Sequence, residues 1–481
     1  MNLNFANSLR SLGLLALSIS LAGCATNPVS GKREVVLMSE NQEIAKGAQY
    51  HKEFVLKQYQ VYEAPELQAY VNDLGQRLAA ISHRNNLDFT FTLLDSPEVN
   101  AFALPGGYVY ITRGIMAYMN SEEDLAGVLG HEIGHVTARH SVRQERSQTL
   151  TSLGVLLAAI ATKSNQIAQT AGQLGTAWVR GYGRKHELEA DRLGAEYLAR
   201  ADYDPEKMLD VVGILKDQEL FEIQRAREEG REPRVYHGVF STHPRNDLRL
   251  QEVVRAAKKY KNPNAIQTNP ERFLRLMDRV TFGYSEEQGI PRGNRFYHKP
   301  LDFTMSFPKN WRLQNQPSQL LALRPDGSAA IIVTIDQLNG GESPAQYVSR
   351  KFKNFTNGQH TVSGGYTGLA VAQTPYGNRE VRVVSVPHKG QVLVVAGFAR
   401  GQRPDGQIIE TANSIRRLKS SERKLASAKS IKLVRTKSGD TFARLARKSD
   451  LESYAVDQLR LINGMYPDGE PRPGQLIKIV Q

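Results

Sequence analysis

The pattern of hydrophobic and polar positions divides the chain into two kinds of segment. From about residue 40 to 260, apolar residues recur at helical spacing, which predicts a mainly helical domain. Residues 87–94 interrupt this pattern with the alternation typical of a strand. Residues 101–104 and 108–112 are two more strand candidates, on either side of a Pro-Gly-Gly turn signal. We therefore expect helices with a small sheet.

Two helices stand out in this first part. Ser121 precedes three acidic residues and can cap the free N–H groups of a helix that begins there, while the acids suit its positive end. Residues 184–200 form the second clear helix. Between the two lies an apolar stretch, residues 153–161, which is about half the length of a membrane span. We expect it to be a buried helix or a flap over a site, with a contact to a membrane interface as the less favoured alternative.

After residue 295 the pattern changes to strands and turns. Strand candidates lie at 329–335, 380–386 and 391–398, with helical pieces near 343–355 and 407–418. This predicts a small α+β domain over 296–418, with linkers at 283–295 and 419–430. The domain resembles the PsbP/Mog1-like fold. The last residues, 431–481, form a further compact unit, so the predicted class of the whole chain is α+β.

The amino terminus has the features of a targeting segment over residues 1–23. Arg10 precedes an apolar stretch at 12–22, which suits a signal peptide. It ends in Leu21-Ala22-Gly23-Cys24, which resembles a bacterial lipobox, and Cys24 is the only cysteine of the chain. The resemblance implies that Cys24 is acylated and anchors the protein in a membrane. Ala25 at the next position implies the outer membrane, with the protein facing the periplasm.

Composition and charge narrow the class of protein further. The 481 residues are 40% hydrophobic and 23% charged, which excludes a disordered chain, a collagen-like fibre and a multi-span membrane protein. The net charge of +13 favours anionic surroundings. A single cysteine excludes disulfide scaffolds and cysteine-rich zinc modules. Any metal site must therefore consist of histidines and carboxylates.

The most informative stretch is His131-Glu132-Ile133-Gly134-His135. On a helix, residues four apart share a face, so the two histidines can bind one metal ion. Glu132 is rotated by about 100° from His131, which lets it reach a water rather than the metal. Zinc prefers imidazole nitrogen and accepts a carboxylate. This segment therefore predicts a zinc site with one further protein ligand.

The second helix offers that ligand. Glu187 and Asp191 are four apart and share a face, so a carboxylate from Glu187 completes a two-histidine, one-glutamate set. Asp191 is then placed to accept a hydrogen bond from the far nitrogen of a ligand histidine. Glu189 is the less favoured alternative, since it points elsewhere. His140 and His186 lie off these faces, and we predict surface or capping roles for them.

These motifs together resemble a known family. The HExxH helix, Glu187-x-x-Ala190-Asp191 and Asn-Ala-Phe-Ala-Leu-Pro-Gly-Gly at 100–107 are similar to the HtpX/BepA-type zinc metallopeptidases, relatives of the CAAX prenyl endopeptidases. The resemblance covers about residues 25–260. It implies a gluzincin fold over 24–282, one zinc ion per chain on His131, His135 and Glu187, and Glu132 as the catalytic glutamate.

A further match to this family is Ser241-Thr242-His243-Pro244 followed by Arg249. A cation or N–H donor near the zinc stabilises the oxyanion of a tetrahedral intermediate, which is one role for His243 or Arg249. In a second interpretation, His243 occupies the open zinc position and holds the enzyme latent. In a third, the His-Pro pair only begins a helix. The residues leave these alternatives open.

The expected mechanism follows from the motifs. Glu132 takes a proton from the attacking water and passes it to the leaving amine. Asn100, Ala101, Phe102 and Ala103 are the predicted substrate-binding residues, because residues 101–104 as an edge strand would pair with an extended peptide through main-chain hydrogen bonds. Such binding recognises the main chain of the substrate more than its side chains, so we expect unfolded or misassembled proteins as substrates.

The carboxy-terminal unit resembles a LysM module. Lys437-Ser438-Gly439-Asp440-Thr441 precedes a helix, a second helix ends in Asn463-Gly464, and Pro473-Gly474 precedes a last strand. The resemblance implies binding of glycans that contain N-acetylglucosamine, such as peptidoglycan. A purely structural role for the module stays open.

We therefore expect a zinc endopeptidase of the cell envelope that acts on misfolded or misassembled proteins. The alternative is a peptidoglycan-binding lipoprotein scaffold or chaperone with a latent zinc site. A cell-wall hydrolase is a third reading, which the protein-peptidase character of HExxH disfavours. Nucleic acid is not an expected partner, since an exported lipoprotein rarely meets it.

Overall fold

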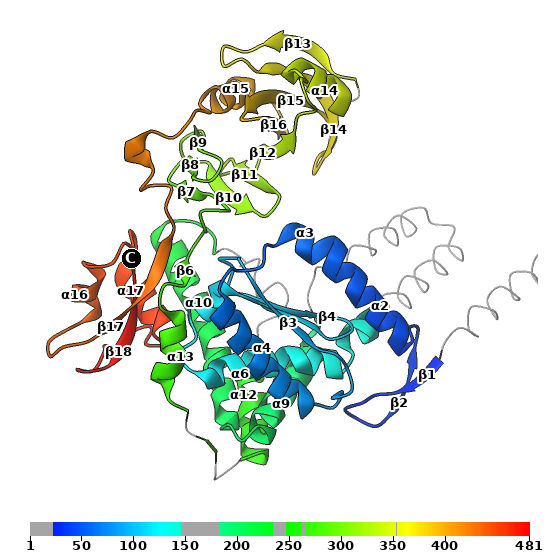
Figure 1. Ribbon diagram of the computed structural model, residues 1–481, viewed down its shortest axis with the longest axis vertical. Coiled ribbons are helices and arrows are strands. Elements are labelled where there is room, and N and C mark those ends of the chain that lie inside the picture. The colour runs from blue at the N-terminus through cyan, green and yellow to red at the C-terminus, as the bar shows by residue number, and fades with distance from the viewer. Residues whose placement is uncertain (1–22, 146–181, 234–246, 262–264, 267, 353) are drawn as a thin grey trace, which may run out of the picture. The chain divides into compact units, whose positions relative to one another are not determined.

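The computed structural model describes residues 23–145, 182–233, 247–261, 265–266, 268–352 and 354–481 (Figure 1). They form two compact units. Unit 1 contains the chain up to Phe282 and again from Ser430 to Gln481, and unit 2 contains Gly283–Lys429. Both helices and sheets occur in each unit, which confirms the α+β class.

A small sheet in unit 1 is made of β3 (Thr90–Leu94), β4 (Ala101–Leu104) and β5 (Tyr108–Thr112). The strand order is β3-β5-β4, with β3 parallel and β4 antiparallel to β5. The turn between β4 and β5 requires glycine at Gly106 and Gly107, whose φ angles are +79° and +92°. A Cβ at Gly107 would also lie 2.6 Å from the Asp88 carbonyl oxygen. All three predicted strands are confirmed.

Helix α6 (Glu122–Thr137) lies at the centre of unit 1 and is buried along almost its whole length. It contacts α4 (Pro65–Ala80), α9 (Arg184–Arg200) and α10 (Met208–Glu228). Helix α12 (Asp247–Lys259) packs against α9. The bounds of α9 are those that the sequence predicts.

The start of α6 is a capping box, and its Ser121 cap is the one that the sequence predicts. The Ser121 hydroxyl accepts a hydrogen bond from the Asp124 amide at 3.2 Å, and the Asp124 carboxylate accepts one from the Ser121 amide at 3.2 Å. These bonds satisfy N–H groups that have no partner within the helix. Glu122 and Glu123 add negative charge at the positive end of the helix dipole.

Shorter elements complete the first part of unit 1. Before α4 the chain forms a hairpin and a helical stretch, and the remaining elements lie between and after the main helices. They are β1 (Gly23–Thr26), β2 (Arg33–Val36), α2 (Glu40–Tyr50), η1 (His51–Val55), α3 (Leu56–Gln58), α5 (Arg113–Met116), η3 (Pro205–Lys207), α13 (Pro270–Met277) and β6 (Thr281–Phe282).

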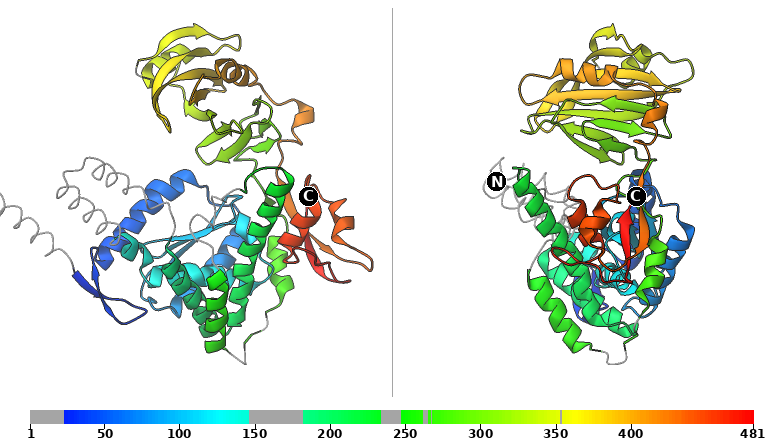
Figure 2. Two further views of the ribbon diagram at one scale, coloured as in Figure 1. Left: turned by 180° about the vertical axis from the view of Figure 1, so that it is seen from behind. Right: turned by 90° about the vertical axis from the view of Figure 1, so that its left-hand side faces the viewer.

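The carboxy-terminal segment has the predicted order of strand, helix, helix and strand. Its elements are β17 (Lys429–Arg435), α16 (Phe442–Ala446), α17 (Ala455–Ile462) and β18 (Leu476–Val480). It differs from the predicted separate domain, because it belongs to unit 1. The Ile431 amide donates to the Val280 carbonyl at 2.8 Å, so β6 extends the sheet in the order β18-β17-β6. Figure 2 shows these elements in orange and red against the green helices of the same unit.

A buried lysine forms hydrogen bonds between this segment and the loop that precedes α6. The side chain of Lys478 in β18 is fully buried, and its Nζ donates to the carbonyl oxygens of Ala117 and Met119 at 2.7 Å each. Burial lowers the pKa of Lys478 to about 7, against the opposing field of Asp124. The two carbonyls directly precede the cap of α6, so the last strand of the chain holds that loop in place.

Unit 2 is built on a seven-stranded antiparallel sheet with the order β10-β11-β12-β16-β15-β14-β13. A second, three-stranded sheet has the order β7-β8-β9. The elements are β7 (Ile290–Arg292), β8 (Arg295–His298), β9 (Phe303–Ser306), β10 (Arg312–Gln316), β11 (Gln319–Leu323), β12 (Ala329–Gln337), α14 (Pro344–Lys351), β13 (Thr356–His360), β14 (Tyr366–Thr374), β15 (Gly377–His388), β16 (Gln391–Ala399), α15 (Asp405–Asn413) and η4 (Ser420–Glu422).

The two predicted linkers belong to unit 2 as far as Lys429. Residues 283–295 include β7, in which Ile290 is buried and pairs with Tyr297 of β8. Residues 419–430 include η4, whose Glu422 forms ion pairs with Arg416 at 2.7 Å and Arg295 at 3.2 Å. The Lys-, Ser- and Ala-rich composition of 419–430 predicts a linker, but the ion pairs of Glu422 tie this stretch to the rest of the unit.

Several sequence predictions fall outside the described residues. These are the signal peptide up to residue 22, the apolar stretch 153–161 and His243. Among the helices that are described, none has the length and apolar character to cross a membrane.

The role of Lys478 is testable by substitution. We expect Lys478→Ala to lower the free energy of unfolding by about 1–3 kcal/mol, because it leaves two buried carbonyls without their donor. Denaturant unfolding followed by circular dichroism measures the loss. Lys432→Ala is the matched control, since Lys432 lies in the same segment and its hydrogen bond to Gln481 is exposed. An equal effect of the two substitutions would contradict this role.

Candidate metal centre

Helices α6 and α9 bring three predicted ligands together. His131 and His135 lie one turn apart on α6, and Glu187 lies in the first turn of α9. The Nε2 atoms of the two histidines are 3.0 Å apart. The Glu187 carboxylate oxygens lie 3.6 Å from His131 Nε2 and 3.5 Å from His135 Nε2. All three side chains are buried, and one ligand atom from each lies within 4.8 Å of the others.

These distances fit a single metal ion. Two ligand atoms bonded tetrahedrally to zinc at about 2.0–2.1 Å lie about 3.3 Å apart, close to the three observed separations. Two imidazoles and one carboxylate are also a donor set that zinc accepts at catalytic sites. The residues present therefore fit a zinc ion with one position left for a water or substrate.

Asp191 orients the first ligand histidine. Its carboxylate oxygen Oδ1 lies 2.9 Å from Nδ1 of His131, and the Asp191 side chain is fully buried. Burial alone lowers the pKa of His131, but the hydrogen bonds with Asp191 and Glu187 raise it to about 10. The Asp191 carboxylate thus lies beside Nδ1 of His131, and Nε2 is the ring nitrogen that faces the ligand cluster.

Glu132 follows His131 on α6 and is 2% exposed. Tyr182 lies within reach of its charge: burial raises the pKa of Tyr182, and the fields of Glu132 and Glu187 raise it further. The Tyr182 ring stacks on His135, with ring centroids 4.0 Å apart and an angle of 16° between the planes. The glutamate thus lies in a water-poor setting next to the ligand histidines.

His140 is a site residue that sequence analysis misplaced. It is fully buried rather than on the surface, and its Nδ1 lies 2.8 Å from Nδ1 of His135. The prediction was wrong because it extended the helical spacing past residue 138. Arg139 has a φ of +54°, so the helix breaks there and His140 turns back toward the site. No periodicity in the sequence indicates this break.

Glu189 takes no part in the ligand cluster, in agreement with the preference for Glu187. It forms an ion pair with Arg143 at 2.7 Å and lies 3.2 Å from His140 Nε2. Burial opposes its ionisation, but the hydrogen bonds from His140 and Arg143 lower the pKa of Glu189 to about 2. His186 is half-buried and stacks on His140 with ring centroids 4.3 Å apart.

Strand β4, predicted to bind substrate, is at the edge of its sheet and packs against α6. The Thr112 amide donates to the Asn100 carbonyl at 3.0 Å, which makes these two a hydrogen-bonded pair. Because such pairs alternate along antiparallel strands, the N–H and C=O groups of Ala101 and Ala103 point away from β5. No strand among the described residues pairs with that side of β4.

Other predicted site residues are less completely placed. His243 lies outside the described residues. Arg249 lies in α12. The structure describes its backbone but not its side chain. Cys24 lies in β1, opposite Val35 of β2, and its side chain is likewise outside the description.

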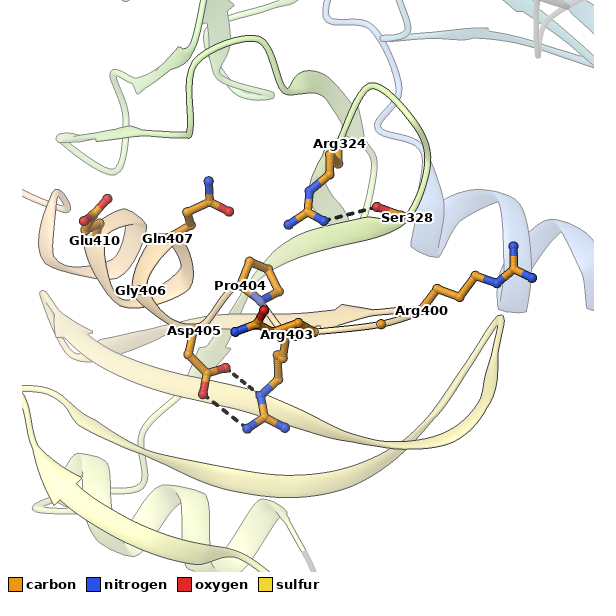
Figure 3. A pocket seen from close by; sticks show the side chains of 11 residues that line it. Arg324, Ser328, Arg400, Arg403, Pro404, Asp405, Gly406, Gln407 and Glu410 are labelled. Atoms are coloured by element: carbon orange, nitrogen blue, oxygen red, sulfur yellow. Dashed lines mark hydrogen bonds and ion pairs between the residues drawn. The ribbon is translucent and has the colours of Figure 1, made fainter.

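Unit 2 contains an open polar pocket of about 680 Å³ (Figure 3). Arg403 pairs with Asp405 at 2.5 Å, and Arg324 donates to the Ser328 hydroxyl at 3.1 Å. Arg400 points away from the pocket in Figure 3. Because Arg403 and Arg324 already pair within the chain, the pocket gives no indication of a ligand.

Residues 65–257 match the family model for peptidase family M48. The similarity to this family concerns less than half of the 481 residues. The match contains α6, α9 and the whole ligand cluster, and it confirms the expected metallopeptidase resemblance. The carboxy-terminal segment, which resembles LysM, lies outside the matched range.

Named relatives agree with this assignment. The chain is 31% identical over 273 residues to a beta-barrel assembly-enhancing protease from Yersinia pestis, covering 55% of this chain and 54% of the relative. It is 35% identical over 221 residues to the protein of that name from Escherichia coli K12, covering 44% and 42%. The mitochondrial metalloendopeptidase OMA1 of Schizosaccharomyces pombe is 34% identical over 137 residues, covering 28% and 40%. The chain thus spans about half the length of these relatives or less.

The ligand assignment predicts the effect of removing the carboxylate. We expect Glu187→Ala to weaken zinc binding by more than about 100-fold, since losing a ligand exceeds the effect of losing an orienting group. Competition against a chelator of known affinity measures it. Glu196→Gln is the control, because Glu196 is an acid of the same helix that pairs with Arg200 and Tyr260 instead. Unchanged zinc affinity in Glu187→Ala would contradict the assignment.

Proposed function

We propose that this protein is a zinc-dependent endopeptidase that hydrolyses peptide bonds of misfolded or misassembled proteins in the cell envelope. The observation that carries the proposal is the buried cluster of His131, His135 and Glu187, with Glu132 on the same helix, inside an M48 domain. A ligand cluster alone suits a structural metal, but a glutamate beside it supplies the proton transfer that hydrolysis requires.

The residues of the metal centre have different roles in the proposed peptide hydrolysis. A zinc ion, when bound, acts as a Lewis acid that polarises the substrate carbonyl and makes a water more acidic. Glu132 takes the proton of the attacking water and delivers it to the leaving amine. Asp191 holds the His131 ring in place. His243 and Arg249 remain proposed contributors, as oxyanion donors or, for His243, as a group that holds the site latent.

Edge strand β4 supports a peptide substrate in extended form. The outward backbone groups of Ala101 and Ala103 supply hydrogen bonds that a peptide strand can complete. Such pairing is independent of substrate side chains and needs an unfolded segment. That requirement favours misfolded proteins over one defined sequence.

Three features support an envelope location. Two relatives of this chain are named beta-barrel assembly-enhancing proteases, a name that refers to barrel assembly. Cys24 lies in the lipobox-like segment, at which an outer-membrane anchor is proposed. The segment at 431–481 resembles LysM, and together with the net charge of +13 it suits binding to peptidoglycan.

The catalytic role of Glu132 is tested by Glu132→Gln. We expect it to bind zinc as the wild type does and to lose about 100- to 10,000-fold in cleavage of unfolded casein, because the proton acceptor is gone. Glu123→Gln is the control, since Glu123 is another buried acid of α6 that binds Thr268. Casein cleavage by Glu132→Gln at the wild-type rate would refute this mechanism. Wild-type protein without chelator-sensitive cleavage would instead favour the scaffold or chaperone alternative.

Backbone recognition is tested on the substrate. We expect N-methylation of one amide that pairs with β4 to lower kcat/KM by about fivefold or more, because one hydrogen bond is worth about 1 kcal/mol. Peptides methylated at successive positions around the cleavage site give the measurement. The expected result is sensitivity at alternate positions. Uniform rates along the series would contradict strand pairing.

A further inference from the structure

The second ligand histidine, His135, has a polar neighbour of its own. Its Nδ1 faces Nδ1 of His140 at 2.8 Å, and Nε2 of His140 faces a Glu189 carboxylate oxygen at 3.2 Å. Arg143 pairs with the same oxygen at 2.7 Å. We propose that His140 and Glu189 form a positioning pair that fixes the ring nitrogen through which His135 binds the metal.

The backbone brings His140 into this position by a local break. On a continuous helix, a residue five places after His135 would lie about 140° around the axis and could not face it. Arg139 adopts a left-handed conformation with a φ of +54°, which is costly for a residue other than glycine. Two contacts hold it there: its Nε donates to Glu43 at 2.8 Å in a buried hydrogen bond, and its guanidinium donates to the Met38 carbonyl at 3.3 Å in a partly buried one.

The hydrogen-bond directions follow from the acceptors at both ends. The Glu189 carboxylate accepts only, so His140 Nε2 must carry the hydrogen that it donates. A neutral His140 then has a bare Nδ1, which accepts from Nδ1–H of His135. That leaves Nε2 of His135 as the atom with a free lone pair, and Nε2 is the atom that faces His131 and Glu187. With a neutral His140, every contact from Glu189 to His135 joins a donor to an acceptor when Nε2 of His135 carries no hydrogen and can bind a metal.

The two ligand histidines are therefore oriented in different ways. Nδ1 of His131 lies directly against the buried carboxylate of Asp191, at 2.9 Å. His135 donates to a neutral imidazole, and the compensating negative charge lies one residue further away on Glu189, where Arg143 balances it. This arrangement keeps one buried negative charge away from the ligand cluster while still fixing the tautomer.

The inference rests on the metal site of the proposed function but not on peptide hydrolysis, so its test uses metal binding alone. The decisive pair is Glu189→Gln and Glu189→Lys in the full-length protein. Glutamine can still accept a hydrogen bond from His140. Lysine can only donate one, so it would reverse the direction of the hydrogen bonds that run from His135 through His140 to position 189. Glu189 is partly exposed, so both side chains are accommodated at the surface.

We expect Glu189→Gln to bind zinc within about threefold of the wild type, and Glu189→Lys to bind it at least about tenfold more weakly. At His140 itself, His140→Phe should lose about 10- to 100-fold in zinc affinity, and His140→Gln should recover most of that loss. His186→Ala is the matched control, because His186 stacks on His140 outside this chain of contacts.

Zinc affinity is measured by chelator competition, and the visible absorption of the cobalt-substituted protein reports the ligand geometry. Circular dichroism of the metal-free variants shows whether each is folded.

If His140→Phe fails to fold, the glutamine and lysine variants of Glu189 decide the question. Equal zinc affinity and equal cobalt spectra for Glu189→Gln and Glu189→Lys would overturn the proposal. So would a folded His140→Phe that binds zinc as the wild type does. Loss of casein cleavage with normal metal binding would count against the proposed function and leave this inference standing.

Discussion

Close packing of α6 on α9 is the contact on which the rest of the site depends. Glycine at position 134 of α6 favours it: a Cβ there would lie 3.1 Å from the Cβ of Leu193 and 3.2 Å from the Ala190 carbonyl oxygen, so α9 would have to shift by a few tenths of an ångström. At Gly130 the helices are also close, since a Cβ there would lie 3.4 Å from the Cα of Gly194. At this separation a carboxylate from the first turn of α9 reaches two imidazoles on α6. The ligand geometry is thus a consequence of helix packing.

Both ends of α6 are held by groups from distant parts of the chain. At its start, Lys478 binds the carbonyls of Ala117 and Met119, just before the capping serine. At its end, Arg84 donates to the Val136 carbonyl at 3.1 Å and pairs with buried Glu43 at 2.8 Å. Buried charges are costly, and these are retained because each satisfies backbone groups that the helix cannot pair itself. A helix fixed at both ends keeps its histidines in a constant position relative to α9.

Local sequence signals predicted much of this structure. The Ser121 cap, the extent of α9 and the shared face of Glu187 and Asp191 follow from helical period and cap chemistry, which act within a few residues. The position of His140 does not, because it depends on a left-handed residue that only tertiary contacts stabilise. The union of the carboxy-terminal segment with the peptidase unit was also missed. It rests on a strand of two residues, β6, and on a lysine that looks like a surface residue in sequence.

The polar network around the ligand histidines also bears on what the site is for. A buried arrangement of imidazoles and carboxylates is less stable than an apolar core of the same shape unless every group is paired. In this chain the pairing of His135 with His140 requires a strained backbone at Arg139, which costs more. Both costs are offset if the network holds its histidines as metal ligands, since metal binding then adds stability to the folded state alone. The strain at Arg139 and the direction of the hydrogen bonds thus favour the same conclusion, that this part of the chain is shaped to bind a metal.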